Sequence, residues 1–313
     1  MLRRAAKPGR TEQRNPRSRG LDRKSTSEIL SVLNREDARA ARAVRRELPS
    51  IARAVEAIVD NFRAGGRLFY VGAGTSGRLA TLDAAECPPT FGTSPRRIRA
   101  IVAGGARALR FAIEGAEDSA RDGARDLARA RVGRRDVVVG ISASGATPYV
   151  LGALKLARRH GAVTVGVTSN RRSPLARLAQ ISIAVGTGPE AVAGSTRLKA
   201  GTAQKMVLNM LSTAAMTRLG RIYEDWMVYV ALTNKKLRER GARILQQAAG
   251  VNASAAEHAL RQARHDLPAA LVMLNSGASA KEAHRILRAS GGNVREALKA
   301  ATRRNRRSKA RVN

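Results

Sequence analysis

The chain has 313 residues and carries 58 Lys and Arg against 24 Asp and Glu, a formal net charge of +34. With 43% hydrophobic residues it can bury a sizeable core, which excludes disorder throughout. The single cysteine excludes an internal disulfide framework, and the sequence shows neither a signal-peptide pattern nor an apolar run of about 18 residues. These features predict a cytoplasmic protein without a membrane span.

The positive charge is concentrated at the two ends. Residues 1–24 carry nine basic and two acidic residues, and residues 303–313 carry six basic and no acidic ones. Basic residues bind nucleic acid by neutralising phosphates, but the remaining charge is scattered among alanines at helical spacing, and aromatic residues are only 3% of the chain. We expect no more than weak, sequence-independent binding of nucleic acid by the tails.

The N-terminal region is predicted as a basic arm over 1–24 and helices over 25–66. Residues 11–25 are polar and turn-rich. Ser25 and Glu28 then have capping-box spacing ahead of an apolar helical pattern. A Gly-Gly pair at 65–66 ends the helical pattern.

Five short apolar runs follow, at residues 67–74, 98–105, 136–145, 162–170 and 181–188. Helix-patterned segments lie between them, at 76–86, 106–130, 147–160 and 174–179. This alternation predicts an α/β fold with a doubly wound, five-stranded parallel sheet. In the strand order 2-1-3-4-5 the direction of winding reverses between the first and third strands, and ligands bind beyond the carboxyl ends of those strands.

The C-terminal third has a helical pattern. Residues 195–220 predict one long helix with an apolar side that includes Val207 and Leu211. Residues 251–301 predict a unit of three or four helices, in which AAGVNASAAEHAL is echoed by RASGGNVREAL. In both copies Gly is followed by Asn, which predicts a glycine helix end and an asparagine N-cap.

Two hydroxyl-rich loops fall at the predicted reversal of winding. The first strand ends in GAGTSG (72–77) and the third in SASGATP (142–148), and each loop opens a helix whose N-terminal N–H groups suit an anion. GAGTSG also has the spacing of a dinucleotide-binding motif, but the second strand ends in AGG (103–105) with no acidic residue for a ribose. The Ser and Thr residues of both loops favour a phosphomonoester.

Carboxylates are the candidates for proton transfer. The four histidines lie outside both loops, and no His and Cys group has metal-ligand spacing, so we expect no metal site. Glu86 precedes Pro88 and Pro89, which we expect to end the first crossover helix. Glu114, Glu117 and Asp118 form a second acidic group, and a carboxyl in either place can act as a general acid or base.

Several stretches together resemble one family. They are TEQRNPRSRGLD, FYVGAGTSGRLATLDAAECPPTFG, AIEGAEDS, DVVVGISASGATPYV and GPEAVAGSTRLKAGTAQKMVLNMLST. On these residues, from position 11 to position 300, the chain resembles the N-acetylmuramic acid 6-phosphate etherases. These bacterial proteins have a sugar isomerase (SIS) domain and are related to glucokinase regulatory protein. The resemblance implies a homodimer with a SIS domain at 67–240 and a small helical domain at 241–302. The extension at 1–10 and the basic tail at 303–313 fall outside the resemblance.

The resemblance also implies a carbon–oxygen lyase with no cofactor. Its reaction would cleave the D-lactyl ether of N-acetylmuramic acid 6-phosphate, giving N-acetylglucosamine 6-phosphate and D-lactate during recycling of cell-wall amino sugars. In the open-chain sugar the C1 aldehyde acidifies the hydrogen on C2, so one carboxylate can remove it while a protonated carboxyl assists lactate to leave C3. The resemblance makes Glu86 the proton donor and Glu117 the base, while their roles in the hydration half stay open.

The binding residues implied by the resemblance lie in the two loops and at the start of the long helix. Ser76, Ser142, Ser144 and Thr147 match phosphate-binding positions. Ser195 and Lys199 have two interpretations of equal weight. Either they contact the substrate or a second subunit, or they have a structural role.

Three other functions compete with the lyase. One is a non-catalytic sugar-phosphate-binding regulator, as glucokinase regulatory protein is, but such a protein would not need both Glu86 and Glu117. A phosphosugar-responsive transcription regulator would need a DNA-binding motif that the arm-like N-terminal region does not suggest. A phosphosugar isomerase is the nearest rival enzyme. In each case the partner is a small anionic sugar phosphate, whose approach the basic chain would favour.

Overall fold

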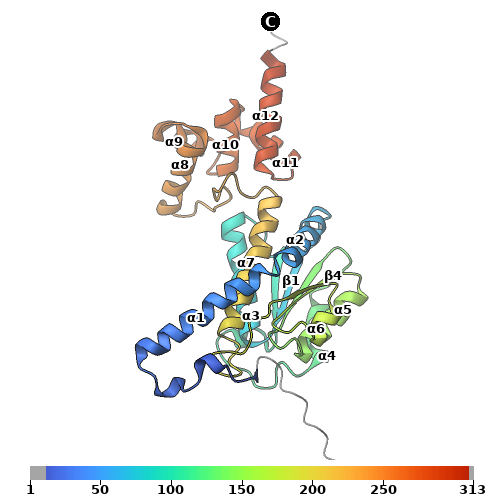
Figure 1. The fold of residues 1–313 in the computed structure, drawn as a ribbon. Helices are drawn as coiled ribbons and strands as arrows, with labels where there is room; N and C mark the ends of the chain where they lie inside the picture. The colour runs from blue at the N-terminus through green and yellow to red at the C-terminus, as the bar shows by residue number, and fades with distance from the viewer. Residues whose placement is uncertain (1–11, 310–313) are drawn as a thin grey trace, which may run out of the picture. The chain divides into compact units, whose positions relative to one another are not determined.

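The structure, a computed structural model, describes residues 12–309 (Figure 1). The chain divides into two compact units: unit 1 comprises Met1–Ala85 and Pro95–Thr213, and unit 2 comprises Glu86–Ser94 and Ala214–Asn313. The domain boundaries predicted from the sequence stay a prediction. Within the described range, no helix has both the length and the apolar character needed to cross a membrane.

Unit 1 contains the predicted parallel sheet. Its order is β2-β1-β3-β4-β5, which confirms the α/β, doubly wound arrangement. The strands are β1 (Leu68–Gly72), β2 (Ile98–Val102), β3 (Val137–Ile141), β4 (Val163–Thr168) and β5 (Ile181–Ala184). Every residue of β1 and β3 is buried, as expected for central strands covered on both faces.

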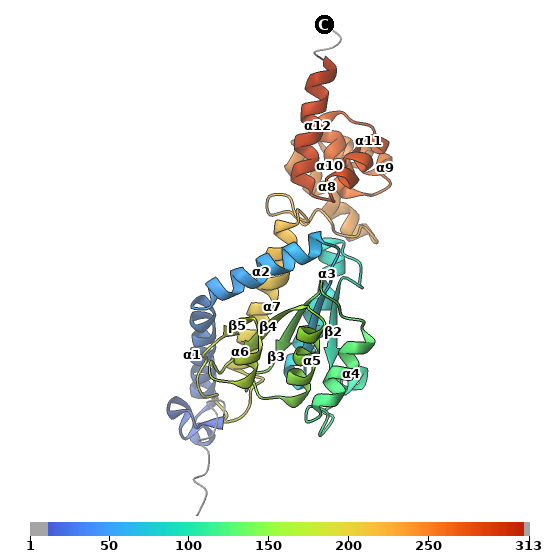
Figure 2. The same ribbon diagram turned by 90° about the vertical axis from the view of Figure 1, so that its right-hand side faces the viewer.

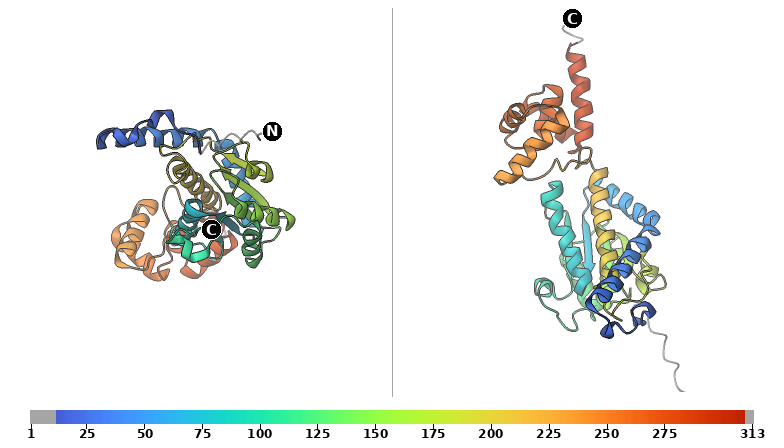
Figure 3. Two further views of the ribbon diagram at one scale, coloured as in Figure 1. Left: turned by 90° about the horizontal axis from the view of Figure 1, so that it is seen from below. Right: turned by 60° about the vertical axis from the view of Figure 1, so that its left-hand side comes forward.

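Helices cover both faces of this sheet. Three crossover helices, α4 (Ala120–Arg129), α5 (Pro148–Arg159) and α6 (Pro174–Leu178), lie on one face (Figure 2). The other face is covered by α3 (Gly74–Phe91), which connects β1 to β2, and by α7 (Lys199–Arg218), the predicted long helix. Figure 3 shows α3 and α7 running side by side.

The prediction that Pro88 and Pro89 end the first crossover helix is wrong. Helix α3 continues through both prolines to Phe91. Cys87 and Phe91, one turn apart, are both buried, so burial of this last turn offsets the two backbone hydrogen bonds that the prolines cannot donate. Glu86 therefore lies in the interior of α3 and not at its end.

The segment 106–130, predicted as helical, is interrupted. It consists of a short 3-10 turn, η4 (Gly105–Leu109), a loop that carries the acidic group, and then α4. Gly115 in the loop has a φ of +70°, a value that glycine adopts without strain. Ser119 then starts α4 as an N-cap, because its Oγ accepts the Asp122 N–H at 3.1 Å.

The N-terminal region has more structure than an arm. Before α1 (Thr26–Arg45) and α2 (Leu48–Arg63) lie two 3-10 turns, η2 (Pro16–Ser18) and η3 (Leu21–Arg23). The predicted capping box of Ser25 and Glu28 is present. Asn15 is buried and ties the segment down, because its Nδ2 donates to Glu36 Oε2 at 2.8 Å and to the Pro189 carbonyl at 3.2 Å. Residues 1–11 of the predicted arm lie outside the described residues.

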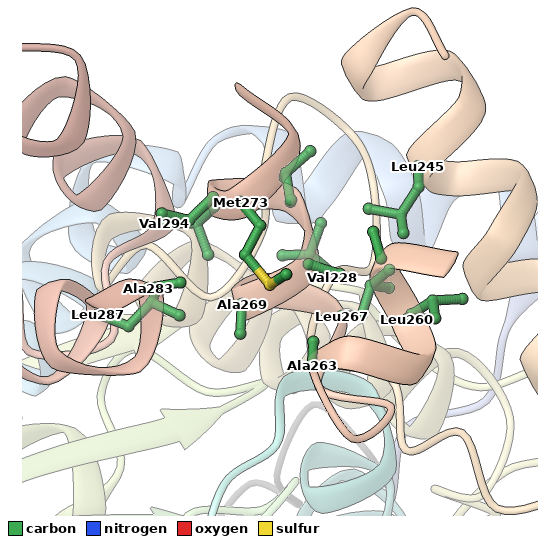
Figure 4. Packing of buried hydrophobic residues seen from close by; sticks show 14 of the residues in the cluster. Val228, Leu245, Leu260, Ala263, Leu267, Ala269, Met273, Ala283, Leu287 and Val294 are labelled. Atoms are coloured by element: carbon green, nitrogen blue, oxygen red, sulfur yellow. The ribbon is translucent and has the colours of Figure 1, made fainter. Parts of the chain in front are cut away.

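Unit 2 contains five whole helices among the described residues, in addition to the last residues of α3 and α7. They are α8 (Lys235–Ala249), α9 (Ala253–Gln262), α10 (Leu267–Ser276), α11 (Ala280–Ala289) and α12 (Val294–Lys309). All residues of α10 from Leu267 to Met273 are buried, and the other helices supply residues such as Leu245, Leu260 and Leu287 to the same core (Figure 4). The predicted N-caps are confirmed, since Asn252 caps α9 and the Asn293 side chain accepts the Glu296 N–H. Residues 310–313 of the predicted basic tail lie outside the described residues.

Candidate functional site

The first hydroxyl-rich loop makes a tight turn between β1 and α3. Gly72 and Gly77 pack so closely that a Cβ on Gly72 would lie 2.8 Å from the Gly77 nitrogen, and one on Gly77 would lie 2.5 Å from Val102 Cγ1. The glycine spacing therefore serves close packing of the helix against the sheet. Ser76 lies in the first turn of α3, buried, and its Oγ donates to Gln204 Oε1 of α7 at 2.9 Å.

The second loop, between β3 and α5, groups three hydroxyls. Ser142 is buried, and its Oγ lies 2.8 Å from Thr147 Oγ1 and 3.3 Å from Ser144 Oγ. The same Oγ accepts the Gly145 N–H at 3.0 Å. Ser144 is exposed and Thr147 is half-buried at the N-cap position of α5. The hydroxyls are thus held at the N-terminus of a helix, where an anion is stabilised.

The two loops share one edge of the sheet. Gly72 at the end of β1 pairs with Ile141 at the end of β3, so both loops start level with each other at the carboxyl edge. The structure therefore brings the four loop residues of the prediction, Ser76, Ser142, Ser144 and Thr147, to the edge where a parallel sheet of this winding binds ligands.

Glu117 lies beside the second loop. Its backbone carbonyl accepts the N–H of Tyr149, a residue in the first turn of α5, at 3.0 Å. Helices α4 and α5 also pack tightly, because a Cβ on Gly152 would lie 1.9 Å from the Ala120 carbonyl oxygen. The exposed side chain of Glu117 is therefore carried by backbone that is fixed to the hydroxyl-bearing helix.

Glu86 has an exposed side chain and belongs to the part of α3 in unit 2. Asp83, one turn earlier and in unit 1, is buried and accepts three hydrogen bonds. The donors are Tyr70 Oη at 2.9 Å, Asn209 Nδ2 at 2.8 Å and Ser212 Oγ at 3.0 Å. This carboxylate fixes α3 to β1 and α7, and so anchors the helix that carries Glu86.

Lys199 has structural contacts. It is 1% exposed, its Nζ pairs with Glu36 of α1, and the same nitrogen donates to the Pro189 carbonyl at 2.6 Å. These contacts favour the structural role that the sequence left open. Ser195 is half-buried in the turn before α7, where its carbonyl accepts the Leu198 N–H at 3.2 Å.

Two buried glutamates near Lys199 have shifted pKa values. Burial acts to raise the pKa of Glu36, but hydrogen bonds from Arg17, Lys199 and Asn15 outweigh it and lower the pKa to about 2. Glu190 caps α7 by accepting the N–H groups of Lys199 and Ala200, yet burial raises its pKa.

The sequence analysis missed Gln204, Glu36, Glu190 and Asp83. Gln204, Glu36 and Asp83 have partners more than 100 positions away, and Glu190 caps α7 from nine positions before Lys199, so no capping or helical spacing marks them. Among the described residues, no group of three or more His, Cys, Asp and Glu could hold a metal ion.

Family models match the sheet-bearing part of the chain. The model described as "Glucokinase regulatory protein N-terminal SIS domain" matches residues 50–158, and the model described as "SIS domain" matches residues 117–214. Together with the strand order, these matches identify a protein with a SIS domain.

Relatives named "N-acetylmuramic acid 6-phosphate etherase" match nearly the whole chain. The relative from Geobacillus thermodenitrificans (strain NG80-2) is 50% identical over 288 residues, which cover 92% of this chain and 98% of the relative. The relative from Edwardsiella ictaluri (strain 93-146) is 51% identical and covers 92% and 96%, respectively. The chain belongs to the N-acetylmuramic acid 6-phosphate etherase family, as its resemblance predicted.

Solved structures are also similar. A putative phosphosugar isomerase from Bacteroides fragilis NCTC 9343 matches with a TM-score of 0.47 and 23% identity, over 62% of this chain and 91% of that one. A phosphoheptose isomerase from Francisella tularensis matches with a TM-score of 0.46 and 16% identity, over 62% and 99%.

Proposed function

We propose that the chain is a carbon–oxygen lyase that cleaves the D-lactyl ether of N-acetylmuramic acid 6-phosphate without a cofactor. The products are N-acetylglucosamine 6-phosphate and D-lactate, which fits a role in recycling cell-wall amino sugars. One observation carries this proposal: the chain is about half identical to proteins of that name over 92% of its length.

The phosphate group of the substrate binds at the carboxyl edge of the sheet. Ser76, Ser142, Ser144 and Thr147 supply hydroxyls there, at the N-termini of α3 and α5. The preorganised hydroxyl group of the second loop supports this assignment, because donors already held in place lose little freedom on binding. Ser195 is proposed as a substrate contact at the start of α7, while the contacts of Lys199 assign it to the protein interior.

Elimination needs one base and one acid. Glu117 takes the proton from C2, the electron pair of that C–H bond forms the C2=C3 double bond, and the C3–O bond to lactate breaks. Glu86 gives its proton to the departing lactate oxygen. Water then adds its oxygen to C3 while C2 regains a proton, which restores the sugar phosphate. Support for Glu117 comes from its fixed backbone beside the second loop.

The assembly and location are part of the same proposal. We place the enzyme in the cytoplasm as a homodimer, with a SIS domain at 67–240 and a helical domain at 241–302. Leu30 and Val192 of unit 1 are large apolar residues that are 61% and 52% exposed, and a contact between subunits would remove such surface from water. Sedimentation velocity of the purified protein tests the dimer, and a monomer at micromolar concentration would contradict it.

The lactate assay tests the function. We expect the purified protein to release D-lactate from N-acetylmuramic acid 6-phosphate stoichiometrically with the sugar product. In water enriched in heavy oxygen, the label should enter the product at C3. An isomerised sugar phosphate with no lactate would favour the isomerase, and binding with no turnover would favour the regulator.

A further inference from the structure

Gln204 is a buried amide with one unpaired end. The residue is 3% exposed in the second turn of α7, and its Oε1 accepts the Ser76 hydroxyl hydrogen at 2.9 Å. Its Nε2 is buried and has no hydrogen-bond partner among the described residues. A buried amide N–H without an acceptor is unfavourable, so this arrangement calls for an explanation.

The position of Gln204 is well fixed. The start of α7 is held by Glu190, which accepts two of its first N–H groups, and by the buried pair of Lys199 with Glu36. The first turns of α7 and α3 also touch, because a Cβ on Gly201 would lie 3.5 Å from Thr75 Cγ2. The amide of Gln204 therefore stays against the Ser76 loop.

Ser76 has a single hydroxyl proton. While that proton is donated to Gln204 Oε1, Ser76 cannot donate it to a phosphate oxygen. A glutamine carries both an acceptor and a donor, so a half-turn of its amide brings Nε2 to Ser76 Oγ. In that orientation Nε2 gains an acceptor, Oε1 gives up its donor, and the Ser76 proton becomes free for an anion.

We infer that Gln204 is a positioning residue for the substrate phosphate. In the free enzyme it holds the Ser76 proton, and in the complex its turned amide donates to Ser76 while Ser76 donates to a phosphate oxygen. The inference rests on the proposed function, since it requires the Ser76 loop to bind the phosphate group.

The Gln204→Glu variant tests the donor end of the amide. An ionised carboxylate only accepts, so it keeps the Ser76 proton and leaves none for the ligand. We expect the Kd for N-acetylglucosamine 6-phosphate, measured by calorimetry, to rise about tenfold to a hundredfold, since the lost contact is a hydrogen bond to a charged group. Gln204→Met cannot donate to Ser76 Oγ in the complex but leaves the Ser76 proton free for the phosphate, so its Kd should rise only about threefold to tenfold, less than that of Gln204→Glu.

Gln180 provides the matched control. Its Oε1 accepts the Thr164 N–H at 2.8 Å, and Gln180 directly precedes β5, at the amino edge of the sheet opposite the loops. Gln180→Met should lower the Tm and leave the Kd unchanged. If Gln204→Met lowered the Tm as much as Gln180→Met and weakened binding as much as Gln204→Glu, the role would be structural and the inference overturned.

The Ser76→Ala variant distinguishes the role of Gln204 from the proposed binding of phosphate by the first loop. If Gln204 acts through Ser76, Gln204→Glu should weaken binding much less in Ser76→Ala than in the parent. An equal loss in both backgrounds would mean that the new charge alone repels the ligand, which overturns the inference but leaves the Ser76 assignment intact. If Ser76→Ala itself binds as tightly as the parent, the phosphate assignment of the first loop fails, and the role of Gln204 with it.

Discussion

At the scale of single residues, each of the two proposed catalytic glutamates can be replaced by glutamine, which has nearly the same side-chain shape. Glu86→Gln and Glu117→Gln each remove a proton-transfer group, and both side chains are exposed, so folding should be unaffected. We expect kcat to fall about a hundredfold or more in each variant, the usual size of a general acid–base contribution. Steady-state lactate release measures this, with product binding as the control. Turnover at the parent rate in both variants would contradict the assignment.

Gly145 shows how strictly the second loop depends on one residue. It has a φ of +70°, and a Cβ there would lie 2.2 Å from Ser173 Oγ. Gly145→Ala should therefore lower the free energy of unfolding by about 2 kcal/mol or more, from strain and a forced shift of Ser173. Denaturant unfolding measures the change. Gly133→Ala is the control, since nothing lies within 4 Å of its added Cβ, and a similar loss there would contradict the argument.

At the scale of elements, the ion pair between α1 and α7 makes stability depend on pH. The folded-state pKa of Glu36 is lowered to about 2 from its ordinary value of 4.5. Its contribution is therefore complete above pH 4.5 and is lost as the pH falls towards 2, because the unfolded chain then binds the extra proton.

The contribution of Glu36 can be isolated with Glu36→Gln, which cannot titrate. Between pH 6 and pH 3 the parent should lose about 2 kcal/mol more unfolding free energy than this variant, somewhat less than the full linkage of the shift. Urea unfolding at both pH values gives the comparison. Equal losses in parent and variant would show that Glu36 does not carry this dependence.

The elements that the sequence predicted correctly are those with a strong local signal. The five strands are short apolar runs bounded by glycine or polar turns, and the N-caps at Ser25, Asn252 and Asn293 follow from spacing alone. The predicted helix end at Pro88 was wrong. Burial of Cys87 and Phe91, which no local pattern reveals, outweighed the tendency of proline to end a helix.

The candidate site divides in the same way. The two hydroxyl loops could be predicted, because their residues are contiguous and each follows a strand. Gln204 could not, since its partner Ser76 is 128 positions away and a glutamine in a helix resembles any surface residue. Residues that position a site through the fold become visible only when distant segments are placed together.

At the scale of the whole molecule, the chain has a net charge of +34, and its proposed substrate is an anion. Such a field raises the encounter rate of an anionic ligand, and salt screens it. We expect kcat/KM for N-acetylmuramic acid 6-phosphate to fall several-fold from about 20 mM to about 500 mM potassium chloride, where the Debye length shrinks towards a few ångströms. Stopped assays over this range measure the effect. A value of kcat/KM independent of salt would exclude steering by the chain's charge.

The contact of Asn15 and Glu36 with Pro189 and Lys199 also affects how the molecule is made. Glu36 and Lys199 are separated by 163 positions. At the usual rates of synthesis, about 10 to 30 s pass between the appearance of the glutamate and that of its lysine. During that time the Glu36 carboxylate can reach Asn15 and Arg17 of its own region but lacks the buried lysine with which it pairs in the finished protein. Closure of unit 1 therefore awaits the segment around Lys199, so a chain arrested before that segment keeps its N-terminal region open to proteases and chaperones.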